Sequence, residues 1–158
     1  MTKIDKETLK VFEKLEKLNP EAKFLSESAL SNVTDFVDTG CMALNAIISG
    51  SLYGGVPMGR ITGFSGPSAA GKTYIINKIL ANAQKKGMVP VIFDTEAAVD
   101  ASSTTGVGLD NDQVKYVPVQ TVEDCRNQIS AFLDSVIESK MRDKFIISID
   151  SLGNLASQ

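Results

Sequence analysis

The sequence predicts an α/β fold, in which a mostly parallel sheet carries helices on both faces. Three observations predict it. Short apolar runs rich in β-branched residues alternate with segments of helical periodicity, in the order β-α-β-β-α-β. A glycine-rich loop at 66–73 separates the first apolar run from the first helical segment that follows it. Acidic residues, Glu96 and Asp150, stand at the carboxyl ends of two runs, where parallel sheets bind ligands.

The amino-acid composition excludes several classes of protein and kinds of site. The chain has 158 residues, 43% hydrophobic and 22% charged, and no apolar run of membrane-spanning length, so we expect a cytoplasmic protein without a membrane partner. Histidine is absent, which excludes histidine acid–base chemistry, and the two cysteines, Cys41 and Cys125, have no metal-ligand spacing. The net charge of −3 argues against nucleic-acid binding by these residues alone.

The first 34 residues predict a helix and a linker. Apolar residues recur at helical spacing over 3–18, and Asn19-Pro20 ends the pattern. A single helix cannot bury such a stripe, and the residues leave two partners open, the helix's own domain or a neighbouring subunit. A serine-rich connector follows, with a short strand at 35–37, so we divide the chain into 1–34 and a core at 35–158.

The core elements follow in order. A short helix at 41–48 ends at Gly50, and the turn at 54–59 delivers the chain into a buried strand at 60–65. Past the glycine-rich loop, apolar spacing predicts a helix that ends near Gly87. The remaining segments are a strand at 89–94, a loop at 101–112, a strand at 114–119, a helix capped by Thr121, and a strand at 145–150.

The glycine-rich loop fits the phosphate-binding pattern G-x-x-x-x-G-K-[ST]. Its glycines let backbone N–H groups turn inward toward phosphate oxygens, and the following helix directs its N-terminus at the same anion. Lys72 places a charge against the terminal phosphates, and the Thr73 hydroxyl is a candidate magnesium ligand. The strand and helix on its two sides argue against a chance match in an ordinary turn. The loop comprises Gly66, Pro67, Ser68, Ala69, Ala70, Gly71, Lys72 and Thr73.

The two carboxylates complete the candidate site. Asp150 ends an apolar strand, the position from which a Walker B acid holds magnesium together with the loop hydroxyl. Glu96 is the candidate that orients or deprotonates the water attacking the γ-phosphate. Each has a structural alternative that the residues leave open: a cap of the next turn for Asp150, and a solvated loop carboxylate for Glu96.

Several runs resemble the RecA recombinase family. The segment from Thr39 to Ile61, with Gly-Gly-Val-Pro-Met-Gly-Arg at 54–60, looks like the entry to the RecA core, and Phe93-Asp94-Thr95-Glu96 with Asp100 continues the match. The run Asp150-Ser-Leu-Gly-Asn-Leu-Ala-Ser157 is similar to the Walker B segment of the UvsX-like recombinases of phages. The Walker motifs are common to many ATPases, whereas the entry and the tail are more specific. The resemblance covers residues 35–158 and, more loosely, the N-terminal helix.

The resemblance implies a DNA-dependent ATPase that uses ATP and Mg²⁺, forms filaments on single-stranded DNA and drives homologous pairing and strand exchange. It implies that Lys72 and Glu96 are catalytic, that Asp100 touches the adenine, and that the N-terminal helix packs on a neighbouring protomer. Two positions depart from the family: Ser103 replaces an aromatic residue, so base stacking is weaker or comes from elsewhere, and Tyr74 replaces a small residue. We count both among the nucleotide-binding residues.

The family core continues well past the position of Asp150, so the resemblance implies that these residues form only the first part of it. The DNA-binding segments are expected in the remainder. Two alternatives stay open from the residues: a RecA-fold hexameric helicase or other ring ATPase, and a non-catalytic fragment that modulates recombinase filaments.

Overall fold

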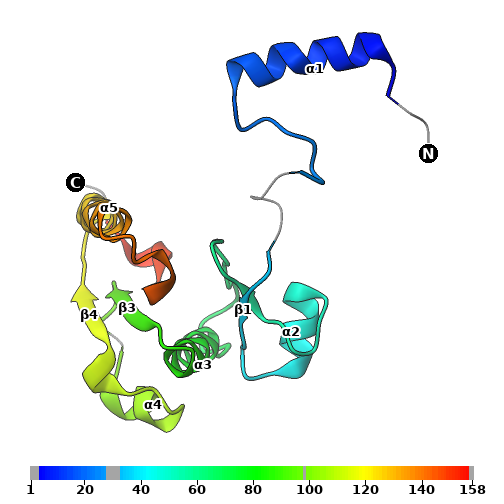
Figure 1. Cartoon of the computed structure of the whole chain (residues 1–158). Helices are drawn as coiled ribbons and strands as arrows, with labels where there is room; N and C mark the ends of the chain where they lie inside the picture. The colour runs from blue at the N-terminus through cyan, green and yellow to red at the C-terminus, as the bar shows by residue number, and fades with distance from the viewer. Residues whose placement is uncertain (1–3, 28–32, 98, 157–158) are drawn as a thin grey trace. The chain divides into compact units, whose positions relative to one another are not determined.

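The computed structural model describes residues 4–27, 33–97 and 99–156. It contains two compact units, Met1–Thr34 and Asp35–Gln158, which are described separately. Figure 1 shows the elements in chain order. None of the helices in the described ranges is long and apolar enough to cross a membrane.

In its described residues, the first unit contains one helix, α1, at Lys6–Leu18. Its N-cap is Asp5, whose Oδ1 accepts hydrogen bonds from the backbone N–H groups of Glu7 and Thr8 at 2.9 and 2.8 Å. The helix ends at Asn19, as the sequence predicts. None of its residues is buried. The exposed large apolar side chains of the helix are Leu9, Val11, Leu15 and Leu18, and Ile4, just before the helix, is exposed as well.

The second unit is built on a parallel sheet with the strand order β4-β3-β5. Its strands are β3 (Val89–Asp94), β4 (Lys115–Pro118) and β5 (Phe145–Asp150). The register pairs Asp94 with Pro118 on one side and with Asp150 on the other. The three carboxyl ends therefore meet at one edge, as the sequence predicts. A separate antiparallel pair joins β1 (Phe36–Val37) to β2 (Val56–Pro57).

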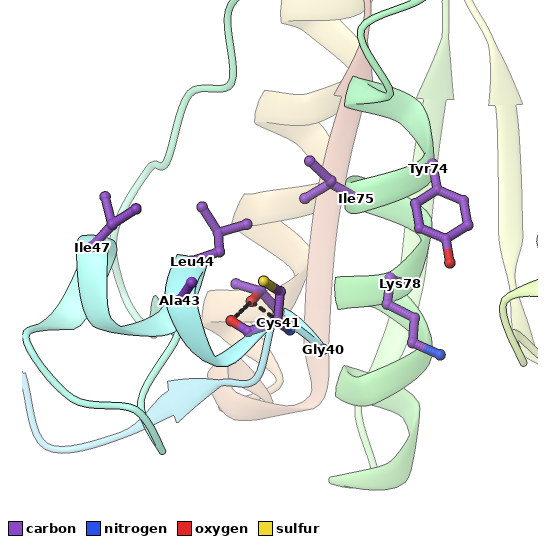
Figure 2. A pocket seen from close by; sticks show the side chains of 9 residues that line it. Gly40, Cys41, Ala43, Leu44, Ile47, Tyr74, Ile75 and Lys78 are labelled. Atoms are coloured by element: carbon purple, nitrogen blue, oxygen red, sulfur yellow. Dashed lines mark hydrogen bonds between the residues drawn. The ribbon is translucent and has the colours of Figure 1, made fainter.

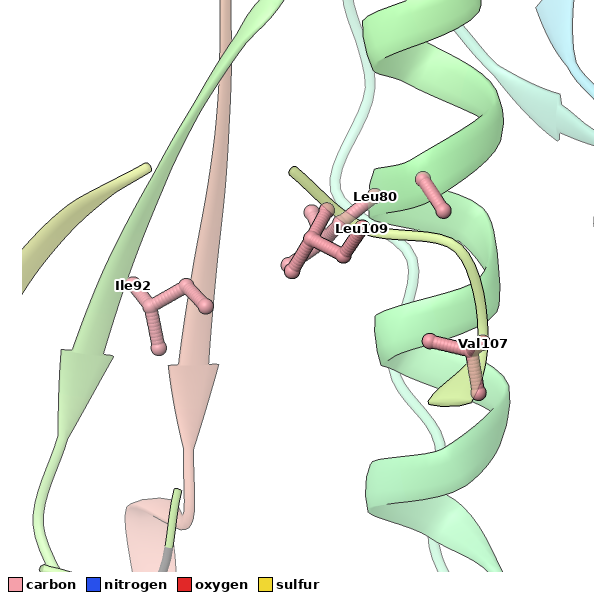
Figure 3. Packing of buried hydrophobic residues seen from close by; sticks show 5 residues of the cluster. Leu80, Ile92, Val107 and Leu109 are labelled. Carbon is pink, nitrogen blue, oxygen red and sulfur yellow. The ribbon is translucent and has the colours of Figure 1, made fainter. Parts of the chain in front are cut away.

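Alternate residues of the strands face two different helices, because successive side chains of a strand point to opposite faces. Helix α3 (Lys72–Lys85) packs on the face that carries Ile92 and Ile146, and Figure 3 shows Leu80 of this helix with Ile92, Val107 and Leu109. Helix α5 (Val122–Glu138) packs on the opposite face, where Cys125 joins Phe93. The predicted arrangement of helices on both faces is confirmed.

The helix ahead of the turn at 54–59 and the cap of α5 also agree with the sequence. Helix α2 (Met42–Ser49) ends at Gly50, which adopts a left-handed φ of 74°. Thr121 caps α5, since its side chain accepts a hydrogen bond from the Asp124 N–H at 3.1 Å. The described residues of this unit also form short 3₁₀ turns: η1 (Asn111–Gln113), η2 (Arg142–Lys144) and η3 (Leu152–Asn154).

The strand predicted at 60–65 is wrong. The segment carries no strand pairing, and the Ile61 side chain is fully exposed, whereas Phe64 packs against the cluster of Val37, Ile79, Ala83 and Met88. An extended segment becomes a strand only when its N–H and C=O groups pair with a neighbour, and the described ladders of the parallel sheet join β3, β4 and β5 only. The observed order is therefore not β-α-β-β-α-β.

The loop predicted at 101–112 is also wrong, because its first half is helix α4 (Ala101–Gly106). Serine and threonine favour loops and helix starts over helix interiors because their hydroxyls compete for backbone groups. Here the hydroxyls bond within the helix itself. Thr104 and Thr105 both donate to the Ala101 carbonyl, at 2.9 and 2.8 Å, and Asp100 caps the N-terminus.

Candidate nucleotide-binding site

The phosphate loop leads directly into α3. Gly71 is the N-cap of this helix and has a φ of 85°, a left-handed conformation that a side chain disfavours. Ala69 also lies at positive φ, 60°. The loop residues from Gly66 to Gly71 are exposed, so their backbone is accessible to a ligand. Together with the unpaired N–H groups of the first turn of α3, this loop offers a site for an anion.

Lys72 is the first residue of α3, and its side chain folds back over the loop. Its Nζ donates hydrogen bonds to the carbonyl oxygens of Gly66 and Pro67, at 3.1 and 3.0 Å. An ammonium group has three donors, so these two bonds leave Lys72 able to donate to a phosphate oxygen as well. The contact of Lys72 with a phosphate stays a prediction.

Thr73 and Asp150, the two candidate magnesium ligands, are in direct contact. The Thr73 hydroxyl donates a hydrogen bond to Asp150 Oδ2 at 2.6 Å, and both residues are half-buried. Hydroxyl and carboxylate oxygens fit Mg²⁺, which prefers oxygen ligands and takes one or two protein groups alongside phosphates and water. The described residues contain no group of three or more His, Cys, Asp or Glu able to hold a metal. The role of Thr73 and Asp150 as magnesium ligands stays a prediction.

Glu96 lies beside the end of β5. Its Oε1 accepts a hydrogen bond of 2.7 Å from the Ser151 hydroxyl, so the side chain is held next to Asp150 although it is exposed. The neighbouring Thr95 adds two contacts to the same residue: its Oγ1 donates to the Ser151 carbonyl at 2.7 Å and accepts from the Ser151 N–H at 2.9 Å. The peptide bond between Asp150 and Ser151 is cis.

Sequence reasoning missed the roles of Thr95 and Ser151. The signal was present, since each is a hydroxyl residue directly after a strand-ending aspartate, Asp94 and Asp150. Because the register places these two aspartates side by side, the residues that follow them are neighbours across the edge.

Asp94 was also missed as a site residue. Its carboxylate is 2% exposed, and it accepts hydrogen bonds from the N–H groups of Glu96 and Val99, at 2.9 and 3.1 Å, and from the Tyr116 hydroxyl at 3.0 Å. Desolvation, followed by the hydrogen bond to Asp94 and the charge of Asp94, raises the pKa of Tyr116. No spacing in the sequence indicates this contact, because Asp94 and Tyr116 are brought together by strand pairing.

Asp100 and Ser103 lie at the start of α4. The Asp100 carboxylate accepts hydrogen bonds from the Ser102 hydroxyl and the Ser103 N–H, and these contacts, the Ser102 hydroxyl first, lower its pKa. Ser103 in turn donates to the Asp100 carbonyl at 2.7 Å. In the described part of the chain no hydrogen bond joins these two residues to the phosphate loop. Their observed role is to cap α4, and their contact with a nucleotide stays a prediction.

Tyr74, directly after Thr73, lines an open pocket of about 420 Å³ between α2 and α3. Figure 2 shows Tyr74 and Lys78 one turn apart on α3, with Leu44 and Ile47 on α2. The Tyr74 side chain is 63% exposed. The pocket is lined by Thr39, Gly40, Cys41, Ala43, Leu44, Ile47, Tyr74, Ile75 and Lys78.

Comparison with known proteins identifies related sequences. The family model described as "RecA N-terminal domain" matches residues 7–158. Protein RecA of Clostridium acetobutylicum is 33% identical over 131 residues, 83% of this chain and 35% of that protein, and Protein RecA of Clostridium tetani is 32% identical over 158 residues, 96% and 42%. DNA repair protein recA homolog 3, mitochondrial, of Arabidopsis thaliana is 32% identical over 117 residues, 74% and 25%. The chain thus spans between a quarter and under half of the length of these relatives.

Proposed function

This chain belongs to the RecA family, and from that premise we propose that it is the ATP-binding part of a DNA recombinase. In this proposal the complete protein is a DNA-dependent ATPase that forms filaments on single-stranded DNA in the cytoplasm and promotes homologous pairing and strand exchange. One relative carries the name of a DNA repair protein, which supports a role in DNA metabolism.

The observation that carries the nucleotide site is the contact between Thr73 and Asp150 beside the phosphate loop. Backbone N–H groups of the loop and the Lys72 ammonium would bind the phosphates. Thr73 and Asp150 would hold Mg²⁺, which supplies positive charge against the phosphate oxygens. Glu96, held beside Asp150 by Ser151, would orient or deprotonate the attacking water.

Self-association is the second part of the proposal. The apolar stripe of α1 is exposed in a unit where no residue of that helix is buried. Apolar surface of this kind gains free energy when another surface covers it. We therefore propose that α1 packs on a neighbouring protomer and contributes to the filament.

The similarity to UvsX-like phage recombinases also stays a proposal. It rests on the run from Asp150 to Ser157, while the relatives compared above are RecA proteins of bacteria and a plant mitochondrial homologue.

Calorimetric titration with ATP and Mg²⁺ tests the nucleotide site. The wild-type chain should bind Mg²⁺·ATP, and Lys72→Ala should weaken binding by about tenfold or more, because a charge-assisted contact to phosphate is lost. Lys85→Ala, at the other end of α3, is the matched control and should bind as the wild type does. Equal affinity for Lys72→Ala and Lys85→Ala would show that the phosphate loop is not the site.

Electron microscopy with single-stranded DNA and ATP tests assembly in the complete protein. Filaments on the DNA are expected. Closed rings without filaments would instead support a ring ATPase.

A further inference from the structure

We propose that Tyr116, acting through the buried carboxylate of Asp94, is a positioning residue for Glu96. The inference rests on the proposed function in one respect, namely that Glu96 acts on the attacking water. Its structural content is independent of that role.

Asp94 is the last residue of β3, the middle strand of the sheet, and it is 2% exposed. A carboxylate removed from water to this degree requires hydrogen-bond donors, because an unsatisfied charge in the interior is strongly unfavourable. The buried carboxylate of Asp94 therefore keeps its hydrogen-bond donors in place, and the donors in turn hold the carboxylate in place.

The donors come from two directions. The N–H groups of Glu96 and Val99 belong to the segment that leaves β3, so their bonds of 2.9 and 3.1 Å fold that segment back over the carboxylate. The third donor, the Tyr116 hydroxyl at 3.0 Å, comes from β4, where Tyr116 pairs with Ile92. Tyr116 thus connects the turn that carries Glu96 to the neighbouring strand β4.

The side chain of Glu96 has a second anchor. The Ser151 hydroxyl binds its Oε1 at 2.7 Å, and Ser151 directly follows Asp150. The backbone of Glu96 is therefore held from β3 and β4, and its carboxylate is held from β5. The two anchors together define where the carboxylate lies relative to the magnesium ligands.

The hydrogen bond from the Tyr116 hydroxyl to Asp94 is separate from the packing of the Tyr116 ring. The side chain is 43% exposed, and it borders a small cavity of about 180 Å³ together with Val99. A phenylalanine would preserve the ring's packing and remove only the oxygen. The substitution Tyr116→Phe consequently isolates the hydrogen bond to Asp94 from the packing of the strand.

The test compares Tyr116→Phe with Tyr53→Phe in the full chain, by NMR. Tyr53 is 86% exposed, so the control removes a phenol oxygen from an exposed side chain. We expect amide hydrogen exchange at Glu96 and Val99 to become faster by about tenfold in Tyr116→Phe, with little change inside β3, β4 and β5. The side-chain carboxyl resonance of Glu96 should also shift, whereas Tyr53→Phe should change neither signal.

Catalysis gives the second measurement. In the complete protein with single-stranded DNA, Tyr116→Phe should keep the affinity for Mg²⁺·ATP within about twofold of wild type. The hydrolysis rate per bound ATP should fall by about tenfold, because binding depends on the loop and turnover on Glu96. A fall in affinity with unchanged turnover would overturn the proposal.

The outcomes separate this proposal from the proposed function. A wild-type chain that binds no ATP would refute the nucleotide site, while the exchange and carboxyl signals would still decide whether Tyr116 positions Glu96. Unchanged signals at Glu96 and Val99, or a uniform rise in exchange across the sheet, would overturn the positioning role. If Tyr116→Phe does not fold, Asp94→Asn is the second variant, and the same local signals should change.

Discussion

The Thr73 hydroxyl donates a hydrogen bond of 2.6 Å to Asp150, although 77 residues separate the two in the chain. Thr73 lies in the first turn of α3, and Asp150 is the last residue of β5. The contact joins the phosphate loop to the sheet edge at which β3 and β5 end. Two oxygen donors suited to a hard cation thus meet beside an anion-binding loop.

Removal of the Asp150 charge should reduce the magnesium dependence of ATP binding. Asp150→Asn preserves the shape of the side chain but weakens a metal ligand, so Mg²⁺ should improve ATP affinity by about tenfold less than in the wild type. Calorimetry with and without Mg²⁺ measures the difference. Asp143→Asn, in the exposed turn before β5, is the control. An unchanged magnesium effect in Asp150→Asn would exclude this residue as a ligand.

Two substitutions at Asp100 separate its cap from a contact with the nucleotide. Asp100→Asn keeps an oxygen that accepts from the Ser103 N–H, whereas Asp100→Ala removes the cap. We expect Asp100→Ala to lower the midpoint of urea unfolding and Asp100→Asn to leave it unchanged. A loss of ATP affinity in Asp100→Asn would then report a nucleotide contact. Wild-type affinity in this variant would leave Asp100 with a capping role alone.

The free energy of unfolding should decrease at alkaline pH because Tyr116 loses its proton. Its pKa is raised in the folded chain, by desolvation first and then by Asp94, so above about pH 10 the unfolded chain loses this proton more readily than the folded chain. The stabilisation from Tyr116 is therefore fully present below the pKa that Tyr116 has in the unfolded chain. It is lost as the pH rises through the higher pKa that Tyr116 has in the folded chain. Urea unfolding between pH 8 and pH 12 should show a smaller alkaline decrease in Tyr116→Phe than in the wild type, and identical pH profiles would contradict the shift.

Charges on the apolar stripe of α1 should prevent self-association. Val11 and Leu15 are one turn apart on the helix and are 63% and 54% exposed. The double substitution Val11→Glu with Leu15→Glu should lower the average mass in light scattering, because burying two carboxylates is unfavourable. Glu13→Gln together with Glu16→Gln alters the polar positions and should associate as the wild type does. A wild-type chain that is monomeric at all concentrations would contradict the packing proposed for α1.

The sequence predicted the parts of the fold that depend on local apolar patterns. β3 and β5 are continuous apolar runs, and the stripe of α1 ends at Asn19, so each is visible within a short window. The segment at 60–65 has the same local appearance as a strand, with Ile61 and Phe64. It is not one, because pairing depends on a neighbouring backbone that a short window does not contain.

The candidate site also has a part that the sequence predicted and a part that it did not. Gly71, Lys72 and Thr73 are found by the motif, and Asp150 is found by its strand. The contacts of Asp94 with Tyr116 and of Glu96 with Ser151 join residues 22 and 55 positions apart, and only the register of the parallel strands creates them. Helix α4 was missed for a different reason, because its hydroxyl groups bond within the helix rather than compete with it.

The parallel sheet separates two hydrophobic layers, one on each of its faces. The buried residues that pack with α3, among them Leu80 and Ile92, are different from those that pack with α5, among them Phe93 and Cys125, and the two sets share no member. We therefore expect a change of side-chain volume at Phe93 to affect first the residues on the α5 side. Substitutions in that layer should leave the helix that begins at Lys72 in place.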